Sequence, residues 1–141
     1  MSKLVKIPEA VSLALHSMAV LAEHPGEVIT TKEIADLLGA SSAHLAKVLK
    51  TLEHTGYVRS WRGPAGGFQL AGSADEITLM DIYVAIEGPL ETENCLLTSN
   101  LCGGEACIFG EIIKSLDTQF RERLARTKLS ELKLTLGVHC A

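Results

Sequence analysis

Cysteine is scarce in this chain, with four among 141 residues, and three of the four fall within fifteen residues. Secreted disulfide scaffolds carry more cysteines, more evenly spread, so a reducing compartment and a metal or redox role are favoured. Long hydrophobic runs are also missing. The most apolar early stretch, residues 10–22, is too short to span a bilayer and lacks a convincing signal-peptide cleavage site. We therefore expect a cytoplasmic protein that does not contact a membrane.

The sequence patterns of common catalytic sites are absent too. There is no G-x-S-x-G turn, no Walker-type glycine loop, no H-E-x-x-H pair and no carboxylate pair on a common helix face. An enzyme is therefore the least favoured class. The 47% of hydrophobic residues is nevertheless ample for the core of one compact domain with an additional element.

Positive charge is missing from the middle of the chain. Residues 70–111 contain eight acidic residues and no Lys or Arg. By contrast, residues 41–69 carry four basic residues against Glu53 alone, a net charge of +3 in a chain whose total is −4. The basic segment is suited to face phosphate groups, and the acidic segment would be repelled by them.

Two short helices are predicted in and just before the basic segment. Thr30 and Glu33 have the spacing of a capping box, and Gly39 ends the helix that this box begins. Ser41 or Ser42 caps the second helix, in which apolar residues recur at helical spacing. Such a pair is typical of a helix-turn-helix, although helical hairpins that only build a core show the same spacing.

The outward face of the second helix supplies candidate DNA contacts. Ser42, Ala43 and His44 lie near its start, where the side chains of a recognition helix reach base edges in the major groove. Lys47 and Lys50 follow on the same face, and we expect them to contact phosphates. His44 is expected to influence sequence preference more than overall affinity.

A β-hairpin is predicted directly after these helices, because the strand-like segments YVRSW and FQLA flank the turn-rich run RGPAGG. A helix-turn-helix followed by a basic hairpin is a winged helix, in which Arg62 at the tip is suited to a minor groove. Glycines at the tip let the backbone approach another molecule closely. The DNA-contacting residues predicted in the hairpin are Arg59, Arg62, Gly63, Gly66 and Gly67. Trp61 and Phe68 are expected to pack its strands against the core.

The three clustered cysteines, Cys95, Cys102 and Cys107, lie in a polar segment that contains two adjacent glycines. Their spacing is not the paired C-x-x-C of a zinc ribbon or a thioredoxin-like redox site. Three thiolates in such a loop are soft ligands, suited to an iron–sulfur cluster, copper(I) or zinc. A thiol redox switch without metal, and cysteines that act as small hydrophobic residues, are the alternatives.

A resemblance to a known family rests on the run VRSWRGPAGGFQL, the helix pair before it, and ITLMDIYVAIEG and the three cysteines after it. Over about residues 11–134 the chain resembles the Rrf-type family of winged-helix transcription regulators, with its IscR-, NsrR- and RsrR-like members. The resemblance implies a mostly α fold with a small β-hairpin wing and a long C-terminal dimerisation helix. It also implies a homodimer on a palindromic double-stranded DNA operator. The cysteines would then hold an iron–sulfur cluster, with 2Fe-2S favoured over 4Fe-4S.

This resemblance leaves one ligand position of the cluster to be filled. Gly110 stands where IscR-like members have a histidine, so the IscR-type ligand set is absent. The run LALHSM places His16 at the position of the RsrR-like histidine, which the partner subunit donates, and makes it the candidate fourth ligand. Ser12 occupies the position of the acidic ligand, which leaves Glu9 one turn earlier as the alternative. Cys140 is expected to be a free surface thiol, with a role as a ligand as the alternative.

Three regions are expected: 1–88 as a winged helix-turn-helix DNA-binding domain, 89–108 as the cysteine cluster-binding loop, and 109–141 as the dimerisation helix and C-terminal tail. In the last region, apolar residues recur every three or four positions and form one seam of a long helix. They are Phe109, Ile113, Leu116, Phe120 and Leu124. This seam packs either on its own subunit or, as the resemblance favours, on a second copy.

The expected function is a transcription regulator, a repressor, that senses iron–sulfur status, redox stress or nitric oxide through the cysteines. Two alternatives stay open. One is a cluster-free winged-helix regulator that acts by thiol redox or through a partner protein, as CymR-like members do. The other is a non-regulatory iron–sulfur or zinc protein.

Overall fold

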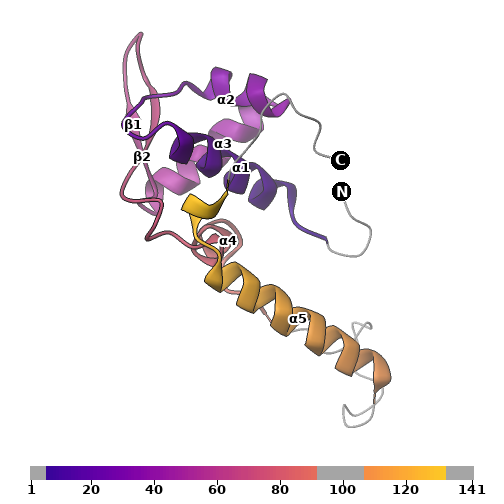
Figure 1. Ribbon diagram of the computed structural model, residues 1–141. Coiled ribbons are helices and arrows are strands. Elements are labelled where there is room, and N and C mark those ends of the chain that lie inside the picture. Colours follow the sequence, from indigo (N-terminus) through magenta and orange to yellow (C-terminus); the bar gives the residue numbers. More distant parts are fainter. Residues whose placement is uncertain (1–5, 92–106, 133–141) are drawn as a thin grey trace.

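The computed structural model describes residues 6–91 and 107–132, without the side chain of Ile108. The elements in chain order are α1 (Glu9–Glu23), α2 (Thr31–Leu38), α3 (Ser42–His54), β1 (Val58–Trp61), β2 (Gly67–Leu70), α4 (Leu79–Glu87), α5 (Ile108–Arg126) and a 3-10 helix (Leu129–Glu131). Figure 1 shows a body that contains α1 to α4 and the hairpin, with α5 projecting from it. The predicted mostly α fold with a β-hairpin is confirmed.

Capping boxes begin helices α2 and α4. Glu33 N donates to Thr30 Oγ1 at 3.1 Å and Thr30 N donates to Glu33 Oε2 at 2.8 Å, which confirms the predicted start of α2. The hydrogen bond from the Thr30 backbone, with a smaller contribution from its hydroxyl, lowers the pKa of Glu33, because both favour the charged carboxylate. Thr78 and Asp81 form the second box in the same way. Both helix starts are therefore fixed by local sequence.

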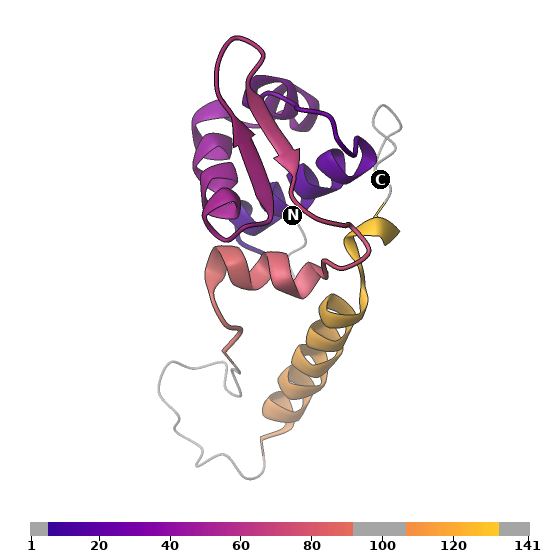
Figure 2. The same cartoon turned by 90° about the vertical axis from the view of Figure 1, so that its left-hand side faces the viewer.

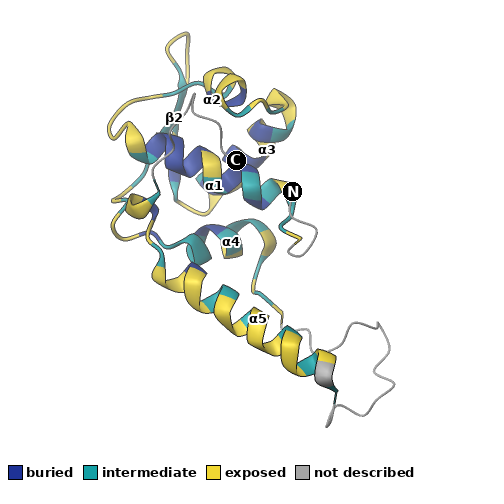
Figure 3. Cartoon of the chain, turned by 45° about the vertical axis from the view of Figure 1, so that its right-hand side comes forward, coloured by how far each residue is buried: buried dark blue, intermediate teal, exposed yellow. Residues whose placement is uncertain are grey.

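Helix α1 is buried along most of its length and forms the centre of the hydrophobic core. Helices α3 and α4, strand β2 and the 3-10 helix all pack against it. Figure 3 shows the buried parts of α1 and α3 within the body, whereas α5 is largely exposed. The largest fully buried apolar side chains are Met18, Leu21, Ile34, Leu45, Leu49, Leu52, Ile82 and Leu129. Helices α2 and α3 are thus held on a rigid base.

The two strands pair antiparallel, from Val58 opposite Leu70 to Trp61 opposite Gly67. Phe68 also pairs with Ile29, just before α2, through backbone hydrogen bonds of 2.8 and 2.9 Å. Phe68 packs against the core, as predicted. Trp61 is 50% exposed, so its predicted core packing is wrong. Successive side chains of a strand alternate between faces, and Val58 is the buried member of β1, so Trp61 three residues later faces outward.

Helix α5 is attached to the body through its C-terminal half. The rings of Tyr83 on α4 and Phe120 meet edge to face, with centroids 6.3 Å apart. Arg121 donates to the carbonyl oxygen of Leu90 at 2.7 Å and forms an ion pair with Asp117 at 2.8 Å. Figure 2 shows α4 between the rest of the body and α5.

The N-terminal half of α5 makes few contacts with the rest of the described chain. Phe109 is 62% exposed, Ile112 53% and Leu116 61%, although all three are large apolar residues. Leu124, by contrast, is buried in its own subunit. Ile113 and Phe120 are half-buried. Among the described residues the predicted seam is therefore only partly covered, since its members Phe109 and Leu116 stay exposed.

Candidate nucleic-acid interface

Helix α3 presents the predicted recognition surface. Ser41 begins the helix, and its Oγ accepts a hydrogen bond from the backbone N–H of His44 at 3.4 Å. The apolar face with Leu45 and Leu49 is buried in the core. The opposite face carries the residues predicted to contact DNA. Of these, Ser42, Ala43, Lys47 and Lys50 are exposed and His44 is half-buried.

A contact that the sequence did not predict joins α1 to the start of α3. Glu9 Oε1 lies 3.8 Å from His44 Nδ1, and the Glu9 side chain is 71% exposed. The sequence suggests different roles for the two residues, Glu9 as the alternative metal ligand and His44 as a base contact. Helical periodicity describes each helix separately, so it carries no signal for this pair.

The hairpin stands beside α3 and is tied to it. Ser60 on β1 donates a hydrogen bond to the carboxylate of Glu53 on α3. Arg59 and Arg62 are exposed on the strand and at the turn. In the described part of the chain, neither arginine forms an ion pair, and neither does Lys47 or Lys50. All four cations are available to external phosphates.

The glycines of the turn are needed for different structural reasons. Gly63 has φ +101°, a conformation that favours glycine, and a Cβ there would meet no atom within 4 Å. A Cβ on Gly66 would lie 2.4 Å from the carbonyl oxygen of Trp61, and one on Gly67 would lie 2.4 Å from that of Ile29. Gly66 and Gly67 are therefore required by close approach within the chain itself. Their predicted contact with DNA is a separate proposal.

The predicted metal-ligand residues are only partly within the described chain. Cys95 and Cys102 lie outside it. Cys107 is a half-buried free cysteine immediately before α5, and His16 is exposed on α1. Within residues 6–91 and 107–132, no three potential ligands gather at one point.

His16 and Cys107 are far apart in the fold. Cys107 stands at the end of α5 that projects away from the body, whereas His16 lies on the central helix (Figure 1). A helix of 19 residues is about 28 Å long. One subunit therefore does not bring these two residues together.

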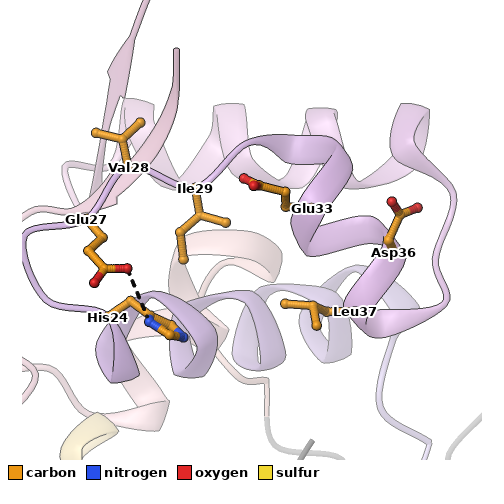
Figure 4. A pocket seen from close by; sticks show the side chains of 7 residues that line it. All are labelled: His24, Glu27, Val28, Ile29, Glu33, Asp36 and Leu37. Atoms are coloured by element: carbon orange, nitrogen blue, oxygen red, sulfur yellow. Dashed lines mark ion pairs between the residues drawn. The ribbon is translucent and has the colours of Figure 1, made fainter. Parts of the chain in front are cut away.

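An open hollow of about 520 Å³ lies between the end of α1, the following loop and α2 (Figure 4). Its rim carries Glu27, Glu33 and Asp36, and His24 Nδ1 lies 3.3 Å from Glu27 Oε2. None of the residues predicted to contact DNA lines it. Its acidic rim distinguishes it from the basic surface of α3 and the hairpin.

Comparison with known proteins identifies the family. The sequence profile of the Rrf2 family, described as iron-dependent transcriptional regulators, matches residues 7–133. The chain belongs to the Rrf2 family. It is 29% identical over 120 residues to the HTH-type transcriptional regulator IscR of Erwinia tasmaniensis, covering 85% of this chain and 68% of that one.

Solved structures of Rrf2-related proteins share the fold. CymR, the global cysteine regulator of B. subtilis, superimposes with a TM-score of 0.75 at 28% identity, covering 90% of this chain and 95% of CymR. IscR of T. potens has a TM-score of 0.71 at 24% identity over 90% of this chain and 85% of that one, and this likeness concerns the fold alone.

Membership in the Rrf2 family confirms the winged-helix fold, DNA binding and transcription regulation as the general function. The relatives and the fold are those of regulators and not of enzymes. Among the helices of the described residues, none has the length and apolar character needed to cross a bilayer.

Proposed function

We propose that this Rrf2 protein is a homodimeric repressor that binds a palindromic operator and senses iron–sulfur status, redox stress or nitric oxide at its cysteines. The DNA-binding part of this proposal rests on four cations on α3 and the hairpin, Lys47, Lys50, Arg59 and Arg62, which form no ion pair with the described residues. We assign region 1–88 to DNA binding, 89–108 to the sensing loop and 109–141 to dimerisation, in the cytoplasm. DNA contacts are assigned to Ser42, Ala43, His44, Lys47, Lys50, Arg59, Arg62, Gly63, Gly66 and Gly67.

The exposed half of α5 supports dimerisation. Phe109, Ile112 and Leu116 recur at intervals of three and four residues, so they lie along one side of the helix. Large apolar side chains in a row on a helix are unfavourable in water, and a second copy of α5 would cover them. A two-fold dimer would place two α3 helices for half-sites about 10 bp apart or a multiple of that spacing.

The donor chemistry of the described residues fits a metal cluster. Cys107 offers a soft sulfur ligand at the N-terminus of α5, where backbone N–H groups favour negative charge. His16 Nδ1 lies 2.7 Å from the carbonyl oxygen of Ser12, so this nitrogen is assigned as the donor and Nε2 retains its lone pair. A histidine ligand needs this arrangement.

The distance between His16 and Cys107 within one chain supports donation of the fourth ligand by the partner subunit. Cys95, Cys102 and Cys107 of one chain would hold a cluster, 2Fe-2S in preference to 4Fe-4S, with His16 of the other, or Glu9 as the alternative. When bound, such a cluster supplies a redox-sensitive charge at the far end of α5. The chain itself connects this end to the body through the packing of α5 on α4 and of α4 on α1 and α3.

A second candidate is a cluster-free regulator. The likeness to CymR, the global cysteine regulator of B. subtilis, favours it. In that case the thiols, or a partner protein, would carry the signal without iron.

Purification without oxygen, followed by visible absorption and iron and sulfide quantitation, tests the sensing half. Coloured protein with iron and sulfide that loses both in Cys102→Ser, but keeps both in the matched Cys140→Ser control, supports the cluster. Colourless, iron-free protein that still binds a duplex selected from a random library would support the CymR-like candidate and end the cluster proposal.

A further inference from the structure

Trp61 occupies an unusual position for the only tryptophan of the chain. It ends β1 and is 50% exposed, although indole is among the largest apolar groups of proteins. Its Nε1–H donates to Gln69 Oε1 at 3.0 Å. The polar atom of the ring is therefore satisfied inside the hairpin, and the exposed remainder is an apolar surface held in place by this bond.

The strand pattern places this surface among cations. Alternation puts Arg59 and Trp61 on the outward face of β1, opposite to the face on which Val58 is buried and Ser60 bonds to α3. Arg62 follows directly in the chain. Arg62 lies outside β1, at the start of the turn, and is exposed. The exposed surface of the hairpin therefore combines the indole and the Arg59 guanidinium on the outward face of β1 with a second guanidinium at the turn.

The charge of the hairpin indicates which kind of partner would cover this exposed surface. Residues 55–74 contain Arg59 and Arg62 and no acidic residue. Neither arginine is engaged by a carboxylate of the described chain. A basic protein surface would be repelled here, whereas a polyanion with apolar sugar groups between its charges matches both components.

We infer that Trp61 is a DNA-contacting residue, with its indole packed against deoxyribose groups at the edge of the groove that the hairpin enters and with Arg59 and Arg62 on the flanking phosphates. This inference rests on the proposed DNA interface. The indole adds an apolar contact to a surface that was predicted from charge and glycine alone.

An apolar contact with sugars has a distinct signature. It carries no base information, so its loss weakens binding to every duplex by the same factor. It releases no counterions, so the slope of log affinity against log salt is unchanged. Loss of an arginine–phosphate contact, in contrast, reduces that slope by about one.

The test uses the full-length protein and a duplex selected from a random library, with a scrambled duplex for comparison. For Trp61→Ala we expect roughly tenfold weaker binding to both duplexes, which corresponds to about a quarter of an indole surface (about 55 Å²) removed from water, with an unchanged salt slope. Trp61→Phe should retain part of the affinity. Leu37→Ala is the matched control, because Leu37 is 48% exposed and lines the acidic hollow. The affinity of this variant for DNA should equal that of the wild type.

Intrinsic fluorescence provides a readout that does not depend on the variants. Emission of Trp61 should become protected from acrylamide when DNA saturates the protein, and should not become protected on concentration of the free protein. Unchanged quenching at saturation, a Trp61→Ala affinity equal to that of the wild type, or protection by self-association would each overturn this inference. If the wild type binds no selected duplex, the proposed function fails as well.

Discussion

Glu9 Oε1 lies 3.8 Å from His44 Nδ1, so a carboxylate of α1 stands against the first turn of the predicted recognition helix. At this distance the carboxylate restricts the orientation of the imidazole. Glu9 therefore has a defined neighbour within its own subunit, whichever ligand completes a metal site.

We predict that Glu9 and His44 act as a unit in sequence preference. Glu9→Gln should reduce discrimination between the selected and scrambled duplexes by about two- to fivefold, the range expected for one exposed ion pair. The same change in a His44→Ala background should have no further effect on discrimination. Asp36→Asn, which removes the same charge at the acidic hollow, is the control, and additive effects of Glu9→Gln and His44→Ala would contradict the prediction.

Arg62→Ala should weaken binding to both duplexes and reduce the salt slope by about one, because one phosphate contact would be lost. Affinity measured between low and moderate salt determines the slope. Lys114→Ala, on the exposed surface of α5, should leave it unchanged. An unaltered slope in Arg62→Ala would remove this side chain from the phosphate contacts.

Leu116→Asp should convert the dimer to a monomer, because it places a charge among apolar side chains that the proposed partner covers. Sedimentation or light scattering measures the mass, and circular dichroism checks that the helices remain. Thr118→Asp, exposed on another side of the same helix, should stay dimeric. A wild type that is already monomeric at micromolar concentration would show that this surface has another purpose.

Ser17→Ala should stabilise the protein. Ser17 is fully buried in α1, and its Oγ has no hydrogen-bond partner among the described residues. Removal of an unsatisfied buried hydroxyl should raise the free energy of unfolding by about 1 kcal/mol, which corresponds to a rise of about 3 °C in Tm for a chain of this size. Thermal unfolding measures it, with the exposed Ser130→Ala as a neutral control. A lower Tm would mean that the hydroxyl has a partner, such as a bound water.

Features governed by local sequence were predicted well. The box of Thr30 and Glu33 and the apolar spacing of α3 are determined within one turn of a helix, and the structure has both as expected. The expected packing of Trp61 against the core is wrong. Alternation from Val58 would have indicated the outward face.

Contacts between elements could not be predicted in this way. The pair of Glu9 and His44 depends on how α1 crosses α3, and the close approach of Gly67 to Ile29 depends on where the loop before α2 meets the hairpin. Neither distance is encoded in a period or a motif. The three-cysteine site stays a prediction from residue type and resemblance, since Cys95 and Cys102 lie outside the described residues.

Within residues 6–91 and 107–132, the contacts that attach α5 to the body involve its C-terminal half, so a rotation about them would move its N-terminal end. Phe120 contacts Tyr83 on α4, and Arg121 contacts Leu90 in the segment after α4. Cys107 lies thirteen residues before Phe120, which is about 20 Å along the helix. A rotation of α5 by about 10° about these contacts displaces Cys107 by roughly 3 Å. Conversely, a shift of several ångströms at Cys107 corresponds to only a small rotation of α5 where the helix contacts the body.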